Sequence, residues 1–351
     1  MTQRTLAGLL AAPLLIALWV AAATEPLPFV TYEPGLTVNV LGDTQGGHDI
    51  IQVQGHKTYP DDQGQLRMTT VYVSQPNARV TLAELMHDWI SPDDAVYPYK
   101  AVYRPNETTQ QNQQQGAVEM VSSQDAATAV ALHELGYDVK PAVEVLSVVD
   151  GSPAQGALKV RDIFLEVNGT KVRSTDDVIK AVQSVPAGQP VHFVVRRDGK
   201  PTDVSVTPQD KGGTPTVGIQ LGTGFQFPFK VSVNIPEAIG GPSAGLMFSL
   251  GIYDTLTPGS LTDGATIAGT GTLDGTGKVG PIGGIQQKIA AARDAGAKLF
   301  MVPPDNCKDA LGAPNGDMRL VKATTMHAAL QAVEAWNANH DATLPSCQED
   351  S

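Results

Sequence analysis

Residues 240–245 read Gly240-Gly241-Pro242-Ser243-Ala244-Gly245, and a mostly apolar run follows them as far as Leu256. Glycine and proline favour a tight turn, so this pattern predicts a helix over residues 244–256 with Ser243 at its start. The first N–H groups of a helix lack intrahelical acceptors and favour negative charge. The segment therefore places a serine hydroxyl beside a predicted oxyanion site.

A second segment, residues 283–288 (Gly-Gly-Ile-Gln-Gln-Lys), opens another predicted helix. Ile285, Ile289 and Ala292 recur at the spacing of one helix face, and Lys288 falls on that same apolar face. Burial disfavours an ammonium group and lowers the pKa of a lysine by as much as ~3–5 units. Because a neutral amine can act as a general base, Ser243 and Lys288 are predicted to form a catalytic dyad.

Two other interpretations of these residues stay open at the level of sequence. Ser243 could be only a capping residue, and Lys288 could extend its amine to solvent along an apolar surface. A Ser-His-Asp triad that uses one of the seven histidines is a further alternative, although no motif marks His133, His192 or His327.

The segments around the pair form a recognisable series. They are residues 241–245, 268–273 (Ala-Gly-Thr-Gly-Thr-Leu), 279–288 (Val-Gly-Pro-Ile-Gly-Gly-Ile-Gln-Gln-Lys) and 299–303 (Leu-Phe-Met-Val-Pro). From residue 215 to 336 the chain resembles the proteolytic domain of Lon-type serine proteases. The resemblance implies Ser243 as nucleophile, Lys288 as general base, protein or peptide substrates, and assembly into a hexameric ring. Two positions differ from cytoplasmic Lon enzymes, which usually carry an acidic residue at Gly240 and a threonine at Ala268.

Residues 119–210 carry a second series of motifs: Leu-Gly-Tyr at 135–137, Gly-Ser-Pro-Ala at 151–154, and Leu-Lys-Val-Arg-Asp-Ile at 158–163. This part resembles a PDZ domain of the bacterial protease-associated type, except that Arg161 stands where a glycine is usual. The resemblance implies that Leu135, Gly136 and Tyr137 form a carboxylate-binding loop for peptide substrates. Leu135 and Gly136 are equally compatible with a simple helix C-cap.

Charge and composition exclude several functions. The 351 residues contain 24 Lys and Arg against 36 Asp and Glu, a formal net charge of −12 without any basic run, so no nucleic-acid partner is expected. The pair Gly277-Lys278 lacks the other residues of a phosphate loop. We therefore expect no ATP and no other cofactor or metal in the reaction.

The N-terminal segment predicts a membrane attachment. Residues 6–23 contain no charge and follow Arg4, which favours an uncleaved signal anchor over a cleaved signal peptide ending near Ala23. The protein is expected to be a single-pass cell-membrane protein with its catalytic part outside the cytoplasm. In that compartment Cys307 and Cys347 are predicted to form a disulfide, with two unpaired thiols as the alternative.

The expected fold is α+β and multidomain. Its predicted parts are a signal anchor or signal peptide (1–24), a strand-rich adaptor (25–118), a PDZ domain (119–210), a Lon-type proteolytic domain (211–340) and a tail (341–351). The polar stretch 108–115 is interpreted as a surface loop. The predicted function is ATP-independent serine endopeptidase activity with a PDZ domain that recruits or gates substrates. A noncatalytic PDZ scaffold with a degenerate Lon-like domain is the alternative.

Overall fold

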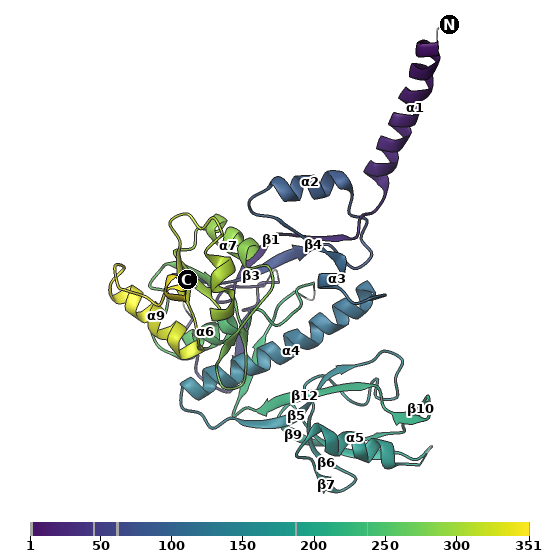
Figure 1. Ribbon diagram of the computed structural model, residues 1–351. Coiled ribbons are helices and arrows are strands. Elements are labelled where there is room, and N and C mark those ends of the chain that lie inside the picture. Colours follow the sequence, from purple (N-terminus) through teal and green to yellow (C-terminus); the bar gives the residue numbers. More distant parts are fainter. Residues whose placement is uncertain (1–2, 45, 61–62, 187, 237, 351) are drawn as a thin grey trace.

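The computed structural model describes residues 3–44, 46–60, 63–186, 188–236 and 238–350, and it shows a mixed α/β chain that forms two bodies (Figure 1). Among the described residues, buried side chains form three hydrophobic cores, two in the larger body and one in the smaller. The larger body is built around a six-stranded sheet of order β18-β17-β14-β3-β1-β4. Its strands β3, β14, β17 and β18 run parallel, whereas β1 is antiparallel to both β3 and β4. The bounds are β1 Phe29–Asn39, β3 Gln65–Val73, β4 Ala95–Pro98, β14 Thr266–Gly269, β17 Leu299–Val302 and β18 Arg319–Lys322.

Helices cover both faces of this sheet. Along β17, Leu299 and Met301 belong to one core and Phe300 and Val302 to the other, as the alternation of side chains in a strand requires. The first face packs against α4 (Thr109–Glu134), α6 (Gly245–Leu256) and α9 (Met326–Ala338); the second packs against α7 (Ile285–Asp294) and α8 (Cys307–Ala310). Helix α6, which begins near Ser243, and helix α7, which contains Lys288, therefore lie on opposite faces of the sheet.

Smaller elements complete the larger body. Strand β2 pairs antiparallel with the distant strand β13, and β15 pairs antiparallel with β16, which follows it closely in the chain. Helix α2 begins after Thr81, whose hydroxyl accepts from the Glu84 amide in a capping box. The bounds are β2 Ile51–Gln54, α2 Leu82–Ile90, α3 Tyr99–Val102, β13 Lys230–Val233, β15 Thr272–Leu273, β16 Val279–Gly280, η1 Pro304–Asn306 and η2 Cys347–Asp350.

The second body has its own sheet and core. Its strand order is β12-β5-β6-β8-β9, with β7 paired to β6, and α5 packs on it through Val178 and Val182. A two-stranded ribbon, β10 with β11, leads back to β12. The bounds are β5 Lys140–Val148, β6 Ile163–Val167, β7 Thr170–Lys171, α5 Thr175–Ser184, β8 Val191–Arg197, β9 Lys200–Val206, β10 Gln209–Lys211, β11 Thr214–Thr216 and β12 Ile219–Gln226.

The segment 25–118, which the sequence suggested as an adaptor, does not form a layer of its own. Its strands β1, β3 and β4 lie in the same sheet as β14, β17 and β18, and β2 pairs with β13. Sequence patterns reveal strands but not their partners, because pairing across 200 residues has no local signature. The second body is thus inserted between two halves of the first.

The interpretation of residues 108–115 as a surface loop is wrong. Thr108 caps α4, because its hydroxyl accepts from the Gln111 amide. The side chain of Gln111 in turn accepts from the Thr108 amide. The stretch contains no proline or glycine, and glutamine is a good helix former, so a polar first turn continues into the buried part of α4.

Helix α1 (Gln3–Thr24) projects from the rest of the chain in Figure 1. Its described side chains are mostly apolar and exposed, such as Leu14 at 68% and Trp19 at 77%. Within the part of the chain that the structure describes, no helix is long and apolar enough to cross a membrane. Residues 1–2 and the side chains at 21–23, where cleavage by signal peptidase was considered, lie outside the described part.

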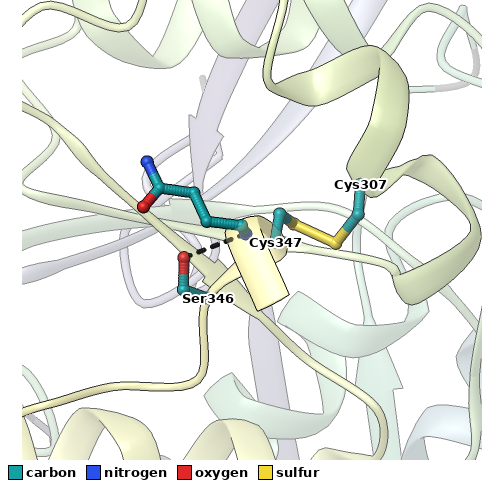
Figure 2. The surroundings of a disulfide bond; sticks show 4 residues. Cys307, Ser346 and Cys347 are labelled. Atoms are coloured by element: carbon teal, nitrogen blue, oxygen red, sulfur yellow. Dashed lines mark hydrogen bonds between the residues drawn. A yellow bond between two sulfur atoms is a disulfide. The ribbon is translucent and has the colours of Figure 1, made fainter. Parts of the chain in front are cut away.

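Figure 2 shows the disulfide between Cys307, at the start of α8, and Cys347, in η2. It closes a loop of 40 residues and lies in the core on the second face of the sheet. Restricting an unfolded chain with a loop of this length stabilises the folded state by about 4 kcal/mol in the chain-entropy account.

Removing this disulfide should therefore lower the free energy of unfolding by about 4 kcal/mol. Urea denaturation of the full chain and of the double variant Cys307→Ser, Cys347→Ser would measure the difference. A double variant as stable as the unreduced wild type would show that the bridge contributes little.

Candidate active site

Ser243 lies in the turn that leads into α6. The first residue after it, Ala244, is the N-cap of the helix, and no side chain caps this end. The Ser243 carbonyl is held twice, by the Gly271 amide at 2.8 Å and by the Thr270 hydroxyl at 2.9 Å. The two residues that follow β14 thus fix the backbone at Ser243, and the serine hydroxyl remains free to bond with other groups.

Lys288 lies in the first turn of α7 and is 2% exposed. Its Nζ donates to the backbone carbonyl of Thr69 at 2.6 Å and to Oγ of Ser243 at 3.0 Å. The lysine does not extend to solvent, and the serine does not cap its helix, so the structure favours neither of the two simpler interpretations of these residues.

The two side chains meet where a parallel strand ends. Strand β14 stops at Gly269, which pairs with Met68 of β3. Among the described residues, no strand pairs with β3 beyond this point on that side. The Thr69 carbonyl is therefore available to Lys288, while the Thr69 hydroxyl donates to the Gly269 carbonyl at 3.2 Å. In open α/β sheets, sites commonly form beyond the carboxyl ends of parallel strands.

Burial lowers the pKa of Lys288 from 10.5 to about 7. A buried ammonium loses its hydration, and only the Thr69 carbonyl and the Ser243 hydroxyl are seen to accept from this Nζ in the described chain. Near neutral pH a large share of Lys288 would carry no charge. A neutral amine 3.0 Å from a hydroxyl can accept its proton.

A pocket of about 330 Å³ opens onto Ser243 and Lys288. One wall is the unpaired side of β3, residues 69–73, and the other is the turn 238–244. Among the described residues, neither the Ser243 amide nor the Ala244 amide donates to a protein acceptor. These two N–H groups at the helix start are suited to stabilise an oxyanion.

Comparisons with known proteins agree with this geometry. Residues 225–334 match the family described as Lon protease (S16) C-terminal proteolytic domain, and residues 117–207 match the PDZ domain family. The chain combines a PDZ domain with a Lon-type proteolytic domain. The sequence-based identification of a serine-type peptidase with these two domains is therefore confirmed at the level of its domains.

The similarity to individual proteins is confined to short regions. A Lon protease of Metamycoplasma arthritidis is 37% identical over 87 residues, and a mitochondrial Lon protease homologue of Emericella nidulans is 42% identical over 93 residues. Each match covers 24% of this chain, but 10% and 8% of the respective relative. The crystal structure of the PDZ domain of an SdrC-like protein from Listeria innocua is 32% identical, covering 23% of this chain and 92% of that one, with a TM-score of 0.22.

Helix α4 supports the turn that carries Ser243. The Gly116 carbonyl accepts from the Gly241 amide at 2.9 Å, and the Ser123 hydroxyl donates to the Pro242 carbonyl at 3.0 Å. A Cβ at Gly240 would come within 3.1 Å of the Gly116 backbone. This close contact explains why glycine replaces the acidic residue that is usual at this position in cytoplasmic Lon enzymes.

The same helix also holds the PDZ domain. Arg161, on a loop of that domain, bonds to Asp125 at 3.3 Å and to Gln124 at 2.6 Å, both on α4. Its backbone has a φ of +70°, which explains why glycine is usual there in related domains. The departure from the PDZ pattern therefore supplies an ion pair between α4 and the loop of the second body that carries Arg161, and both partners on α4 lie within one helical turn of Ser123.

The structure does not support Leu135, Gly136 and Tyr137 as a carboxylate-binding loop. Their amides donate to Ala131, His133 and Leu132 carbonyls respectively, as in a helix C-cap, and Gly136 has a φ of +84°. The next strand, β5, is already paired on both sides, with β12 and β6. The C-cap alternative thus fits the geometry, and the outer strand of this sheet on that side is β12.

Gly136→Ala should consequently act on stability and not on substrate binding. Alanine at a positive φ should destabilise the fold by about 1 kcal/mol or more. The ratio of protein cleavage to short-peptide cleavage should match that of the wild type. If Gly136→Ala selectively slowed cleavage of protein substrates in a folded sample, the carboxylate-binding role would be restored.

The three histidines considered for a triad lie away from the serine. His133 bonds to the Val139 carbonyl at the end of α4, His327 pairs with Glu134, and His192 lies in β8 of the PDZ domain. The pocket at Ser243 is lined by no histidine of the described chain.

Proposed function

We propose that the protein is an ATP-independent serine endopeptidase with Ser243 as nucleophile and Lys288 as general base. The observation that carries this proposal is the 3.0 Å contact between a buried lysine amine and a serine hydroxyl at a helix start. Lys288 Nζ would take the proton of Ser243 as Oγ attacks the scissile carbonyl, and would return it to the leaving amine. The amides of Ser243 and Ala244 would stabilise the oxyanion.

The substrate is proposed to be an extended peptide segment. The unpaired side of β3, residues 69–73, forms a wall of the pocket and offers backbone groups for an added strand. A segment bound in this way would pass Ser243 with both ends free, which suits cleavage within a chain.

ATP independence is supported by the sequence, in which no phosphate loop is present. Cleavage of an unfolded protein such as casein should proceed at the same rate with and without ATP and magnesium. A requirement for ATP would contradict this part of the proposal.

For the PDZ domain we propose a gating role through α4, which contacts both Arg161 and the turn that carries Ser243. Arg161→Gln should slow cleavage of short peptides and proteins alike, by severalfold, because it loosens the support of the turn. Arg196→Gln is the matched control, since Arg196 bonds to Gln226 within the PDZ sheet. Slower cleavage of proteins alone would indicate recruitment, with β12 as the edge for peptide binding.

We also propose that residues 1–24 attach the protein to the cell membrane, with the catalytic part outside the cytoplasm. The uncharged run at 6–23, the exposed apolar side chains of α1 and the disulfide support this placement. Alkaline extraction of membranes should leave the full chain in the pellet and release a chain that starts at residue 25. A hexameric ring is a further expectation from the Lon resemblance, which sedimentation analysis of the full chain would test.

A further inference from the structure

We propose that α2 and the turn that follows it form a site for a first-row divalent transition-metal ion, with His87, Asp88 and Asp94 as ligands. The three residues come together because α2 ends at Ile90 and the chain turns back into β4 at Ala95. One potential ligand atom from each lies within 4.8 Å of those of the other two. Such a spacing is what three donors around a single ion require.

The side chain of Asp88 points to a bound ion. It is 3% exposed, and its Oδ2 has no hydrogen-bond partner among the described residues. A buried polar oxygen without a partner costs folding free energy, and a buried carboxylate costs more. A bound cation would supply the missing partner.

The surroundings of Asp88 add negative charge. Glu33 on β1 and Glu84 on α2 lie near enough to repel it, as does Asp94. Glu84 is already engaged, since its Oε2 accepts from the Thr81 amide at 3.1 Å in the capping box. The charge distribution therefore favours a cation bound by His87, Asp88 and Asp94.

The donor set selects the kind of ion. One imidazole and two carboxylates suit Zn²⁺ or Mn²⁺ better than Ca²⁺ or Mg²⁺, which prefer oxygen ligands alone. His87 is exposed, so water could complete the coordination.

The ion would stabilise a part of the fold that contacts the helix of Lys288. Asp93, next to Asp94, pairs with both terminal nitrogens of Arg293 at 3.1 and 2.9 Å, and its carbonyl accepts from Gln287. Both partners lie on α7. An ion at Asp94 would therefore hold this turn against α7, and its effect should be visible as stability.

The test uses the full chain, stripped of metal with a chelator, and titrates it separately with Zn²⁺, Mn²⁺, Ca²⁺ and Mg²⁺. Zn²⁺ or Mn²⁺ at about 100 times Kd should raise Tm by roughly 5 °C, and elemental analysis after desalting should find one ion per chain. Asp88→Asn, Asp94→Asn and His87→Gln should each remove the shift. Asp203→Asn, an exposed change in the PDZ domain, should leave it intact.

Two results would overturn the proposal. One is the absence of any Tm shift with Zn²⁺ and Mn²⁺ in the wild type. The other is a shift that survives Asp94→Asn and His87→Gln, which would place the ion elsewhere. Since Asp94 is only half-buried, its variant should fold even if Asp88→Asn does not. A response to Ca²⁺ alone that is unchanged in His87→Gln would contradict the imidazole ligand.

Discussion

Replacing Ser243 with alanine should reduce peptide hydrolysis by roughly 10³-fold or more, because the variant lacks the only atom that the proposed mechanism uses as nucleophile. The fold should persist. The turn is held by the Ser243 carbonyl, through Gly271 and Thr270, and not by its hydroxyl. Loss of one hydroxyl near a helix start should cost at most about 1–2 kcal/mol of stability.

The matched control for this variant is Ser249→Ala. Ser249 lies on the same helix, and its hydroxyl bonds to the Leu246 carbonyl inside the core. Rates on a fluorogenic peptide and thermal unfolding of both variants would separate chemistry from folding. If Ser243→Ala cleaved the peptide as fast as Ser249→Ala, the nucleophile assignment would be wrong.

Lys288→Met should abolish hydrolysis to a similar extent, because it keeps the apolar stem but removes the base. In the wild type, activity should rise about tenfold between pH 6 and pH 8, since a base with a pKa of about 7 becomes neutral over this interval. Activity is lost as the pH falls through 7, where the amine gains a proton and can no longer accept one from Ser243.

Stability gives an independent test of the same lysine. Its pKa is about 7 in the folded protein and 10.5 as an ordinary lysine, so between these values the unfolded chain binds more protons. The destabilisation by Lys288 is thus greatest below pH 7 and declines as the pH rises toward 10.5. Lys288→Met should be more stable than the wild type at pH 6, with a smaller advantage at pH 9. Lys298→Met, at an exposed position, is the matched control.

The pair Ser243 and Lys288 could be predicted from the sequence because the signals are local. A glycine-proline turn before an apolar run locates the serine, and a lysine at an apolar helix position indicates burial. Helix α6 begins within one residue of the position expected from this pattern, and α7 contains the predicted apolar face.

The partners of the pair could not be predicted in the same way. Thr69 accepts from Lys288 across 219 positions, and Ser123 supports the turn across 119. Such contacts depend on which strands pair and how helices pack, and no spacing in the sequence records them. The same holds for Leu135 and Gly136, whose pattern fits a cap and a binding loop equally well. Their hydrogen bonds distinguish the two. The role of the unusual Arg161 likewise becomes clear only from its contact with Asp125 on α4.

Covalent labelling tests the central claim, that Lys288 activates Ser243, most directly. The full chain would be treated at pH 8 with a peptidyl phosphonate, an electrophile that forms a stable bond with an activated serine, and digested for mass spectrometry. The account predicts one adduct, on Ser243, which is absent in Lys288→Met and forms about tenfold more slowly at pH 6. An adduct on another residue, or labelling of Ser243 at the same rate in Lys288→Met, would contradict it.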